Sequence, residues 1–278
     1  MASLLQLFRH ILTAFGVIFL VIESYEVVSN NDLNFPYDCF LIIGVFLGIA
    51  SFFVDGFFLS GFMRRELVLP IASADTVFRI KFGDIFEEDG WKVVGVNNFF
   101  DNIVDEDLVS SKSLHGHVLN KYWSTNREDW KQKIRRSLQD VDGVTVSRAK
   151  GNKTKYPIGT TARASTDNHD FLFVALGESN EQNNVVSANT EMLIKAIRGM
   201  ASEARAACAM RPLVVPLMGD GLSRVGMHPS VLVELIITAL IEESRQGKIT
   251  GEIKIIVHSS RANTINLKKH ARNWSHGK

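Results

Sequence analysis

The chain has very little cysteine. Only two cysteines occur in its 278 residues, Cys39 in an apolar stretch and Cys208 in a segment with helical spacing, so neither a disulfide framework nor a thiolate metal site is supported. His115 and His117 have the spacing of a metal pair, but no cluster of carboxylates or cysteines accompanies them. We therefore predict no metal, and a soluble part that lies in reducing cytosol.

An excess of charge of one sign is also absent. The 31 basic and 30 acidic side chains give a formal net charge of +1, which leaves no overall electrostatic footprint for nucleic acid. The sequence contains no internal repeat and no low-complexity tract. Nucleic acid is therefore not an expected partner.

What the sequence does contain is two long apolar stretches, Leu4 to Ile22 and Cys39 to Phe62. A helix that crosses a hydrocarbon core of ~30 Å needs about 20 apolar residues, and the second stretch is long enough to do so with some tilt. Arg9 and His10 interrupt the first stretch, but no small-residue cleavage site follows it, so paired spanning helices are favoured over a signal peptide. We predict a transmembrane helical hairpin over residues 1–65.

Charged residues around these stretches predict the orientation of the hairpin. Basic residues flank its outer ends, at Arg9 and at Arg64 and Arg65, whereas the connecting segment carries only acidic ones. The acidic residues are Glu23, Glu26, Asp32 and Asp38. By the positive-inside rule, both termini and the soluble domain lie on the cytoplasmic side of the cell membrane.

The composition of the hairpin also bears on how it acts. Two apolar spans cannot line a pore by themselves, so any membrane activity requires several chains to form a homo-oligomer. Gly44, Gly48 and Ala50 would allow close contact between helices. Asp55 is the single charge of the second stretch, and we expect it to face a neighbouring helix, a polar cavity or the hydrated edge of the membrane rather than lipid.

Residues 66–278 have the pattern of one α/β domain. Strands are predicted at Val77 to Phe82, Trp91 to Val96, Asp170 to Glu178, Arg211 to Gly219 and Glu252 to Ser260, with a strand and turn over 154–165. Helices are predicted over 126–139, 187–210, 229–246 and 262–272, and a loop over 110–116. This alternation predicts a parallel or mixed sheet covered on both faces, with ligands bound beyond the carboxyl ends of the strands.

One loop that directly follows a predicted strand is rich in glycine. It runs from Met218 to Gly226 and precedes a predicted helix. Glycines there can expose backbone N–H groups to an anion and let the backbone approach a diphosphate closely, although such loops are often only turns. The candidate ligand-binding residues in this loop are Gly219, Asp220, Gly221, Leu222, Ser223 and Arg224, the last as a source of positive charge.

A second set of motifs, in the same order along the chain, resembles that of macro domains. The set comprises Gly83-Asp84-Ile85, then Val94-Gly95-Val96-Asn97-Asn98, then a loop with Gly116, and later the glycine-rich loop already described. The resemblance covers roughly Thr76 to His270 and implies a three-layer α/β/α domain with a mixed sheet that binds ADP-ribose or a derivative.

The resemblance also implies roles for individual residues. Asp84 would accept a hydrogen bond from the adenine amino group, with the Ile85 N–H beside it, and Ser259, Ser260 and Asn263 would lie near the adenine. Ser113, Leu114, His115 and Gly116 resemble a shortened first phosphate loop, and the stretch 219–226 resembles the second. Asn97 matches the first asparagine of the V-N-A-A-N motif, and His115, Phe99 and Phe100 are expected to line the distal subsite.

One departure from the family pattern bears on catalysis. Phe100 stands where hydrolytic macro domains carry the second asparagine of V-N-A-A-N, and the glycine-rich tract after it is reduced to Gly116. Asp101 or Asn102 could replace that asparagine from a shifted loop. The residues therefore favour ligand binding without turnover, with no catalytic residue and no cofactor.

A two-span hairpin fused to a macro domain resembles the membrane effector of the type II Thoeris antiphage system. That resemblance implies a receiver for an ADP-ribose-derived signal, for some members a histidine conjugate, which a TIR-domain partner makes from NAD. Binding would drive oligomerisation and disruption of the bacterial inner membrane, leading to abortive infection. Two alternatives remain open: a membrane-anchored ADP-ribosyl hydrolase, and an adaptor for ADP-ribosylated proteins.

The predicted helix over 126–139 carries an apolar and a basic set of residues. Trp130, Ile134 and Leu138 recur at helical spacing and are predicted to be core. The basic set is predicted to be a solvated helix face, with contact to anionic lipid as the alternative. Its members are Lys131, Lys133, Arg135 and Arg136.

Overall fold

The computed structural model describes residues 2–33, 35–69, 71, 75–221, 225–262 and 264–274. The chain forms two compact units. The first comprises Met1–Arg65 with Asn266–Lys269, and the second comprises Glu66–Ile265 with His270–Lys278.

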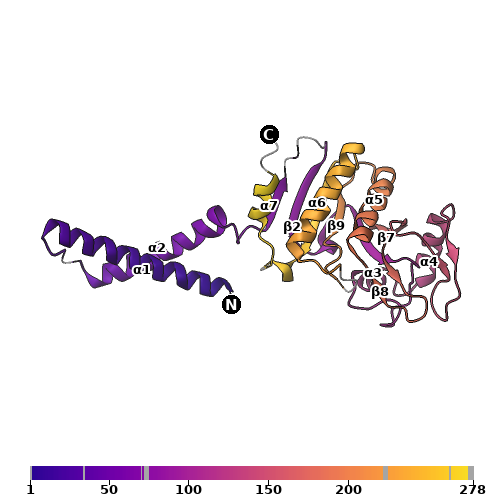
Figure 1. Cartoon of the computed structure of the whole chain (residues 1–278), viewed down its shortest axis with the longest axis horizontal. Coiled ribbons are helices and arrows are strands. Elements are labelled where there is room, and N and C mark those ends of the chain that lie inside the picture. Colours follow the sequence, from indigo (N-terminus) through magenta and orange to yellow (C-terminus); the bar gives the residue numbers. More distant parts are fainter. Residues whose placement is uncertain are drawn as a thin grey trace. The chain divides into compact units, whose positions relative to one another are not determined.

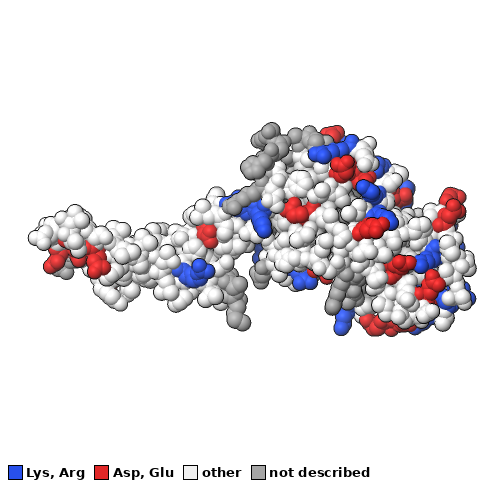
Figure 2. Space-filling model, viewed as in Figure 1, with Lys and Arg blue, Asp and Glu red and all other residues white. Residues whose placement is uncertain are grey.

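The first unit is an antiparallel pair of apolar helices (Figure 1). Helix α1 spans Ala2–Ser29, helix α2 spans Tyr37–Val54, and a π-helical turn over Asp55–Leu59 continues α2. The segments Leu4–Ser29 and Tyr37–Leu59 are long and apolar enough to cross a membrane. Figure 2 shows that most of the hairpin surface carries no charge: acidic residues gather over the connection between the helices, and one basic and one acidic patch lie toward the other end.

Glycines of α2 bring the two helices close together. A Cβ placed on Gly44 would lie 2.1 Å from the ring of Phe15, and one placed on Gly48 would lie 2.5 Å from Cα of Ile11. Asp55 faces the neighbouring helix, as expected, because Nε2 of His10 lies 3.3 Å from its Oδ2. The small residues that favour close contact are therefore used between α1 and α2 of one chain.

The second unit is built on one large mixed sheet (Figure 1). Its strands are β1 (Glu66–Leu69), β2 (Val77–Gly83), β3 (Trp91–Asn97), β6 (Thr161–Ser165), β7 (Asp170–Ser179), β8 (Val186–Ser187), β9 (Leu213–Pro216) and β10 (Glu252–His258). The order is β1-β2-β10-β9-β3-β7-β6, with β8 paired to β7. Strands β2, β10, β9, β3 and β7 run parallel, and β1 and β6 run antiparallel to their neighbours. The carboxyl ends of five strands therefore share one edge.

Helices cover the sheet, which gives the predicted α/β architecture. They are α3 (Leu114–Tyr122), α4 (Arg127–Ser137), α5 (Thr190–Ala207), α6 (Pro229–Gln246) and α7 (Leu267–Trp274), and a short hairpin of β4 (Val144–Thr145) and β5 (Thr154–Lys155) lies outside the sheet. Residues of α3 and α4, including Leu119 and Trp130, pack in one core with Val94 and Phe173. Helix α5 contacts β7 and α6.

The structure adds elements that the sequence pattern did not predict. Strand β1 was not predicted, and the expected loop over 110–116 ends early because α3 begins at Leu114, where the Ser113 hydroxyl caps the N–H of Gly116 at 2.9 Å. The last helix begins at Leu267, five residues later than expected, because Ser259–Arg261 form a 3₁₀ turn instead.

Candidate ligand-binding site

A cavity of about 790 Å³ opens at the shared carboxyl edge of the sheet, beyond β3, β7 and β9. Parallel α/β sheets bind ligands at this edge because the strand ends and the loops that follow them converge there. Of the predicted site residues, the cavity brings together Asn97, His115, Gly219, Asp220 and Gly221. It also includes segments that were not predicted, namely 106–110 and 183–186.

The loop after β9 forms one wall of the cavity, and its glycines have different roles. Gly219 has φ +87°, and a Cβ there would lie 2.7 Å from Cγ2 of Val225, so the turn requires glycine at this position. Among the described residues, none has an atom within 4 Å of a Cβ added at Gly221, apart from its chain neighbours. The predicted residues Leu222, Ser223 and Arg224 lie outside the residues that the structure describes.

Arg261 supplies a cation to this wall, and it was not predicted. Its Nε donates to Oδ2 of Asp220 across 2.7 Å, and both residues line the cavity. Arg261 is carried by the 3₁₀ turn that follows β10. In the sequence, the one feature that could have marked Arg261 as a site residue is its position directly after a predicted buried strand. The ion pair places the Arg261 charge beside the glycine-rich loop. An anionic ligand group there would compete with the Asp220 carboxylate for the guanidinium.

His115 enters the cavity wall from the first turn of α3. The side chain is only 4% exposed, and its ring lies 5.6 Å from that of Trp130. Burial, with a smaller contribution from Arg127, lowers the pKa of His115 to about 3, so the imidazole is neutral at physiological pH. Among the described residues its Nε2 has no hydrogen-bond partner. His115 therefore contributes a neutral wall to the cavity, and no charge.

The segment before α3 contributes acidic and basic side chains to the lining of the cavity. Hydrogen bonds from Ser111, whose N–H lies 2.9 Å from the carboxylate, and then from the Ser110 hydroxyl at 2.7 Å lower the pKa of Glu106 to about 2. Asn184, near β8, donates to the Asp107 carboxylate at 3.2 Å. Glu106, Asp107, Ser110, Lys112 and Asn184 line the cavity, whereas Ser111 does not. They were missed because nothing in the local sequence distinguishes them from an ordinary polar loop.

A buried network of hydrogen bonds holds the Asn97 side chain in place. The Asn97 amide donates to Oδ2 of Asp101 at 2.9 Å, and Arg148 donates to the same oxygen at 2.8 Å. The other carboxylate oxygen accepts the backbone N–H of Asn152 at 2.8 Å. Asp101 is 1% exposed and does not line the cavity, so its carboxylate is committed to structure.

Phe99 and Phe100 do not line this cavity, contrary to the expectation for the distal subsite. Each is 1% exposed, and both line a smaller, separate cavity. Phe100 has φ 51°, and its ring packs against Tyr156 with centroids 5.6 Å apart. The turn after β3 thus directs both rings into the core.

The residues expected near adenine lie further along the same edge, outside the lining of the cavity. Asp84 is exposed, follows β2, and accepts the N–H of Phe86 at 2.9 Å, while Ile85 is buried against Val214 and Ile256. Ser259 is exposed and begins the turn after β10. Asn263 lies outside the described residues.

Gly116 does not line the cavity either. It lies within α3, where a Cβ would come 2.2 Å from the Ser110 carbonyl oxygen. Its role in the structure is close packing of the helix on the preceding loop. In the part of the chain that the structure describes, no group of three or more His, Cys, Asp or Glu side chains is placed to hold a metal.

Comparisons with known proteins agree with this architecture. Residues 78–258 match the family model described as Thoeris protein ThsA, Macro domain. Thoeris protein ThsA from Bacillus amyloliquefaciens (strain Y2) is 25% identical over 213 residues, which cover 74% of this chain and 69% of that protein.

Solved structures of an Oceanobacillus iheyensis macrodomain share the fold. A mutant with ADPR has a TM-score of 0.52 at 14% identity, covering 75% of this chain and 98% of that one. The macrodomain with ADP has a TM-score of 0.51 at 14% identity, covering 75% and 96%.

Proposed function

The chain belongs to the Thoeris protein ThsA macro-domain family, and we propose from this that it is an antiphage effector whose macro domain binds an ADP-ribose-derived signal. The observation that carries the proposal is the large cavity at the carboxyl edge of the sheet, with a glycine loop and the Arg261 cation on one wall. The Oceanobacillus iheyensis macrodomain, which has the same fold, has been solved with ADPR and with ADP.

The strand order supports an extended ligand along the edge. From β2 to β7 the order is β2-β10-β9-β3-β7, so Asp84, Arg261, the glycine loop and Asn97 follow one another along the edge. Neighbouring strands lie about 4.8 Å apart, so these strands span about 19 Å. We propose that adenine binds near Asp84 and Ser259, the diphosphate at 219–224 with Arg261, and the distal group near Asn97 and His115.

The interactions proposed for each part of the ligand follow from the chemistry of the site. The Asp84 carboxylate can accept from the adenine amine, because the single N–H that it accepts from Phe86 leaves lone pairs on the carboxylate. Backbone N–H groups near Gly221 and the guanidinium of Arg261 suit a diphosphate. The neutral His115 ring and the second N–H of the Asn97 amide suit an uncharged ribose or an attached group, since the amide oxygen already accepts the N–H groups of Phe99 and Asp101.

The site favours sensing over hydrolysis. Asp101, the candidate to replace the asparagine of hydrolytic macro domains, is buried and held by Arg148, Asn97 and the Asn152 N–H. Glu106 lines the cavity, but its pKa of about 2 makes it a weak base. These features support a binding role in which the ligand is kept intact.

The proposed output is at a membrane. The two apolar helices would place the chain in the bacterial inner membrane with the macro domain in the cytoplasm, and a TIR-domain enzyme would supply the signal. Binding can drive assembly of several chains only if the ligand has a higher affinity for the assembled state than for the resting one, at about 1.4 kcal/mol for each tenfold ratio. Membrane disruption would follow from clustering of the hairpins.

The experiment that tests the proposal is calorimetric titration of the full chain in detergent with ADP-ribose and with its histidine conjugate. The recovered ligand is analysed by chromatography, and the mass of the complex by light scattering. We expect intact ligand, tighter binding of the conjugate and a larger assembly. Turnover of the ligand would support the hydrolase instead, and binding without a change in mass would support the adaptor.

A further inference from the structure

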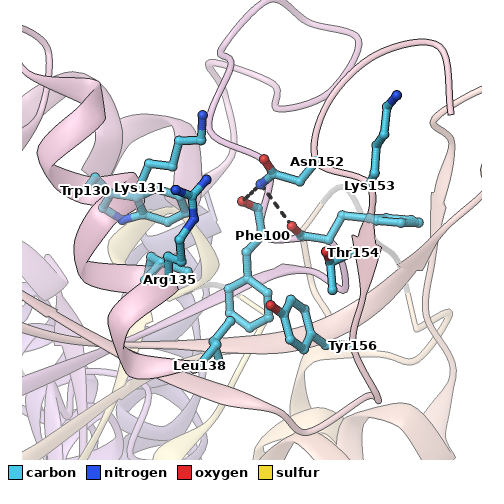
Figure 3. Close-up of a pocket in the computed structure, with 11 residues that line it drawn as sticks. Phe100, Trp130, Lys131, Arg135, Leu138, Asn152, Lys153, Thr154 and Tyr156 are labelled. Carbon is cyan, nitrogen blue, oxygen red and sulfur yellow. Dashed lines mark hydrogen bonds between the residues drawn. The ribbon is translucent and has the colours of Figure 1, made fainter. Parts of the chain in front are cut away.

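A second, smaller cavity lies between α4 and the chain that leads into β5 (Figure 3). Its volume is about 170 Å³, and none of its lining residues lines the large cavity. In Figure 3, Lys131 and Arg135 extend from α4 on one side, and Asn152, Lys153 and Thr154 lie on the other. The family relationship assigns no role to this site.

The floor of the small cavity is aromatic and rigid. It includes Phe100 and Trp130, which are 1% and 0% exposed, and Tyr156 packs edge-on against Phe100. The Asn152 amide fixes the opposite wall, because it donates to the carbonyl oxygens of Phe99 at 3.1 Å and Phe100 at 2.6 Å. The indole N–H of Trp130 is buried and has no hydrogen-bond partner among the described residues. The aromatic packing and these two hydrogen bonds thus hold the floor and the wall in place.

The rim of the small cavity carries cations that lack counter-ions. Arg135 and Lys153 are exposed, and neither forms an ion pair with a described residue, whereas Lys133 on the other side of α4 pairs with Asp129 at 2.7 Å. Lys131 makes only a loose contact of 3.8 Å with Glu128. The charge of Arg135 acts on the Tyr156 phenol, where it opposes the rise in pKa that burial causes. Arg135 and Arg136 are exposed, which agrees with the predicted solvated face, and Lys131 and Arg135 of that face also border the small cavity.

We propose that this cavity is a second binding site, for a small organic anion with a ring or short apolar body. Its phosphate or carboxylate would pair with Arg135 and Lys153, and its body would lie on Phe100 and Tyr156. Arginine suits such groups because its planar fork can bind two oxygens at once. The site lies beside the large cavity, since Trp130 of its floor contacts His115. The proposal does not depend on the proposed function.

Ligand-observed NMR on the full chain in detergent, at low salt, tests the proposal with phenyl phosphate, benzoate and the neutral benzyl alcohol. We expect both anions to bind more tightly than the alcohol. The double variant Arg135→Gln with Lys153→Gln should weaken phenyl phosphate binding ~10-fold or more, and its unfolding midpoint should stay near that of the parent because both residues are exposed. Arg136→Gln is the matched control, since this neighbour does not line the cavity.

Four results would overturn the proposal. The first is equal affinity for the anions and the alcohol. The second is a loss of affinity for phenyl phosphate in Arg136→Gln that equals the loss in the double variant. The third is an equal loss of affinity for phenyl phosphate in Arg261→Gln, which would show that the anion binds in the large cavity. The fourth is competition by phosphatidylglycerol added to the micelles, which would assign the cations to a lipid headgroup rather than to a soluble anion.

Discussion

Arg148 and Asp101 form an ion pair in which Nη1 lies 2.8 Å from Oδ2 and neither side chain reaches solvent. The pair joins the turn after β3 to the segment before β5, and the Arg148 guanidinium also lies 4.1 Å from the centre of the Phe99 ring. It holds the turn that carries Asn97 into the large cavity and Phe100 into the core.

Removing one partner of this pair should destabilise the domain strongly. Arg148→Met leaves a buried carboxylate without its cation, and we expect a loss of ~3–5 kcal/mol in the free energy of unfolding, measured with denaturant. Lys195→Ala, which breaks the exposed pair with Glu191, is the control and should have little effect because solvent screens that pair. Similar losses in both variants would contradict the structural role of Arg148.

The ion pair between Arg261 and Asp220 predicts opposite effects of two substitutions on ligand affinity. Arg261→Gln removes a charge-assisted contact to the proposed diphosphate and should weaken ADP-ribose binding about 10-fold or more. Asp220→Asn removes the competing carboxylate and a negative charge, so it should strengthen binding. Titration calorimetry measures both, and a weakening in Asp220→Asn would show that the carboxylate itself contacts the ligand.

The two glycines of the loop after β9 should respond differently to alanine. Gly219→Ala should lower stability, because its φ is positive and the new Cβ would meet Val225. Gly221→Ala should leave stability unchanged and weaken ADP-ribose binding, because its Cβ would meet no described residue and Gly221 lines the cavity that the ligand is proposed to occupy. Unchanged affinity for ADP-ribose in a folded Gly221→Ala variant would show that the diphosphate does not bind at this loop.

Adenine recognition by Asp84 is tested by Asp84→Ala. We expect ~10-fold weaker binding of ADP-ribose and little change for ribose 5-phosphate, which lacks the base. The substitution also removes the acceptor for the Phe86 N–H, so the unfolding midpoint must be measured alongside. An unaltered affinity for ADP-ribose would refute the adenine role.

The buried His115 predicts a dependence of stability on pH. Its pKa falls from 6.5 to about 3 in the folded chain, so below pH 6.5 the unfolded chain binds a proton that the folded chain does not. Stability is therefore lost as the pH falls below 6.5, by about 2 kcal/mol between pH 7 and pH 5. His115→Leu should remove this part of the pH dependence in denaturant unfolding, and an unchanged pH dependence would show that His115 has the same pKa in the folded and unfolded chains.

The elements that the sequence predicted correctly have local causes. The apolar run of Asp170 to Glu178 and the helical spacing of Trp130, Ile134 and Leu138 depend on neighbours in the chain, and both were confirmed. Helix α3 was missed because Gly116 suggested a loop, whereas the glycine is needed for a close approach to the Ser110 carbonyl. That approach depends on packing, so a single sequence does not reveal it.

The unpredicted parts of the site depend on long-range pairs. Arg261 meets Asp220 across 41 residues of chain, and Arg148 meets Asp101 across 47. Charge and spacing along one sequence do not identify such partners. The same limit explains why Phe100 was expected in the cavity: its position in the motif was clear, but the left-handed turn that directs its ring into the core was not.

The close contact of α1 and α2 at Gly44 and Gly48 has a consequence for the proposed membrane function. In a bilayer, a hairpin that has already used Gly44 and Gly48 internally presents mainly aliphatic and phenyl groups outward, and these adhere to another copy no better than to lipid tails. Copies at ordinary density would stay dispersed. Under the proposed function, such a chain could be kept in the membrane without harm until its ligand appears, and its response would need no new protein synthesis.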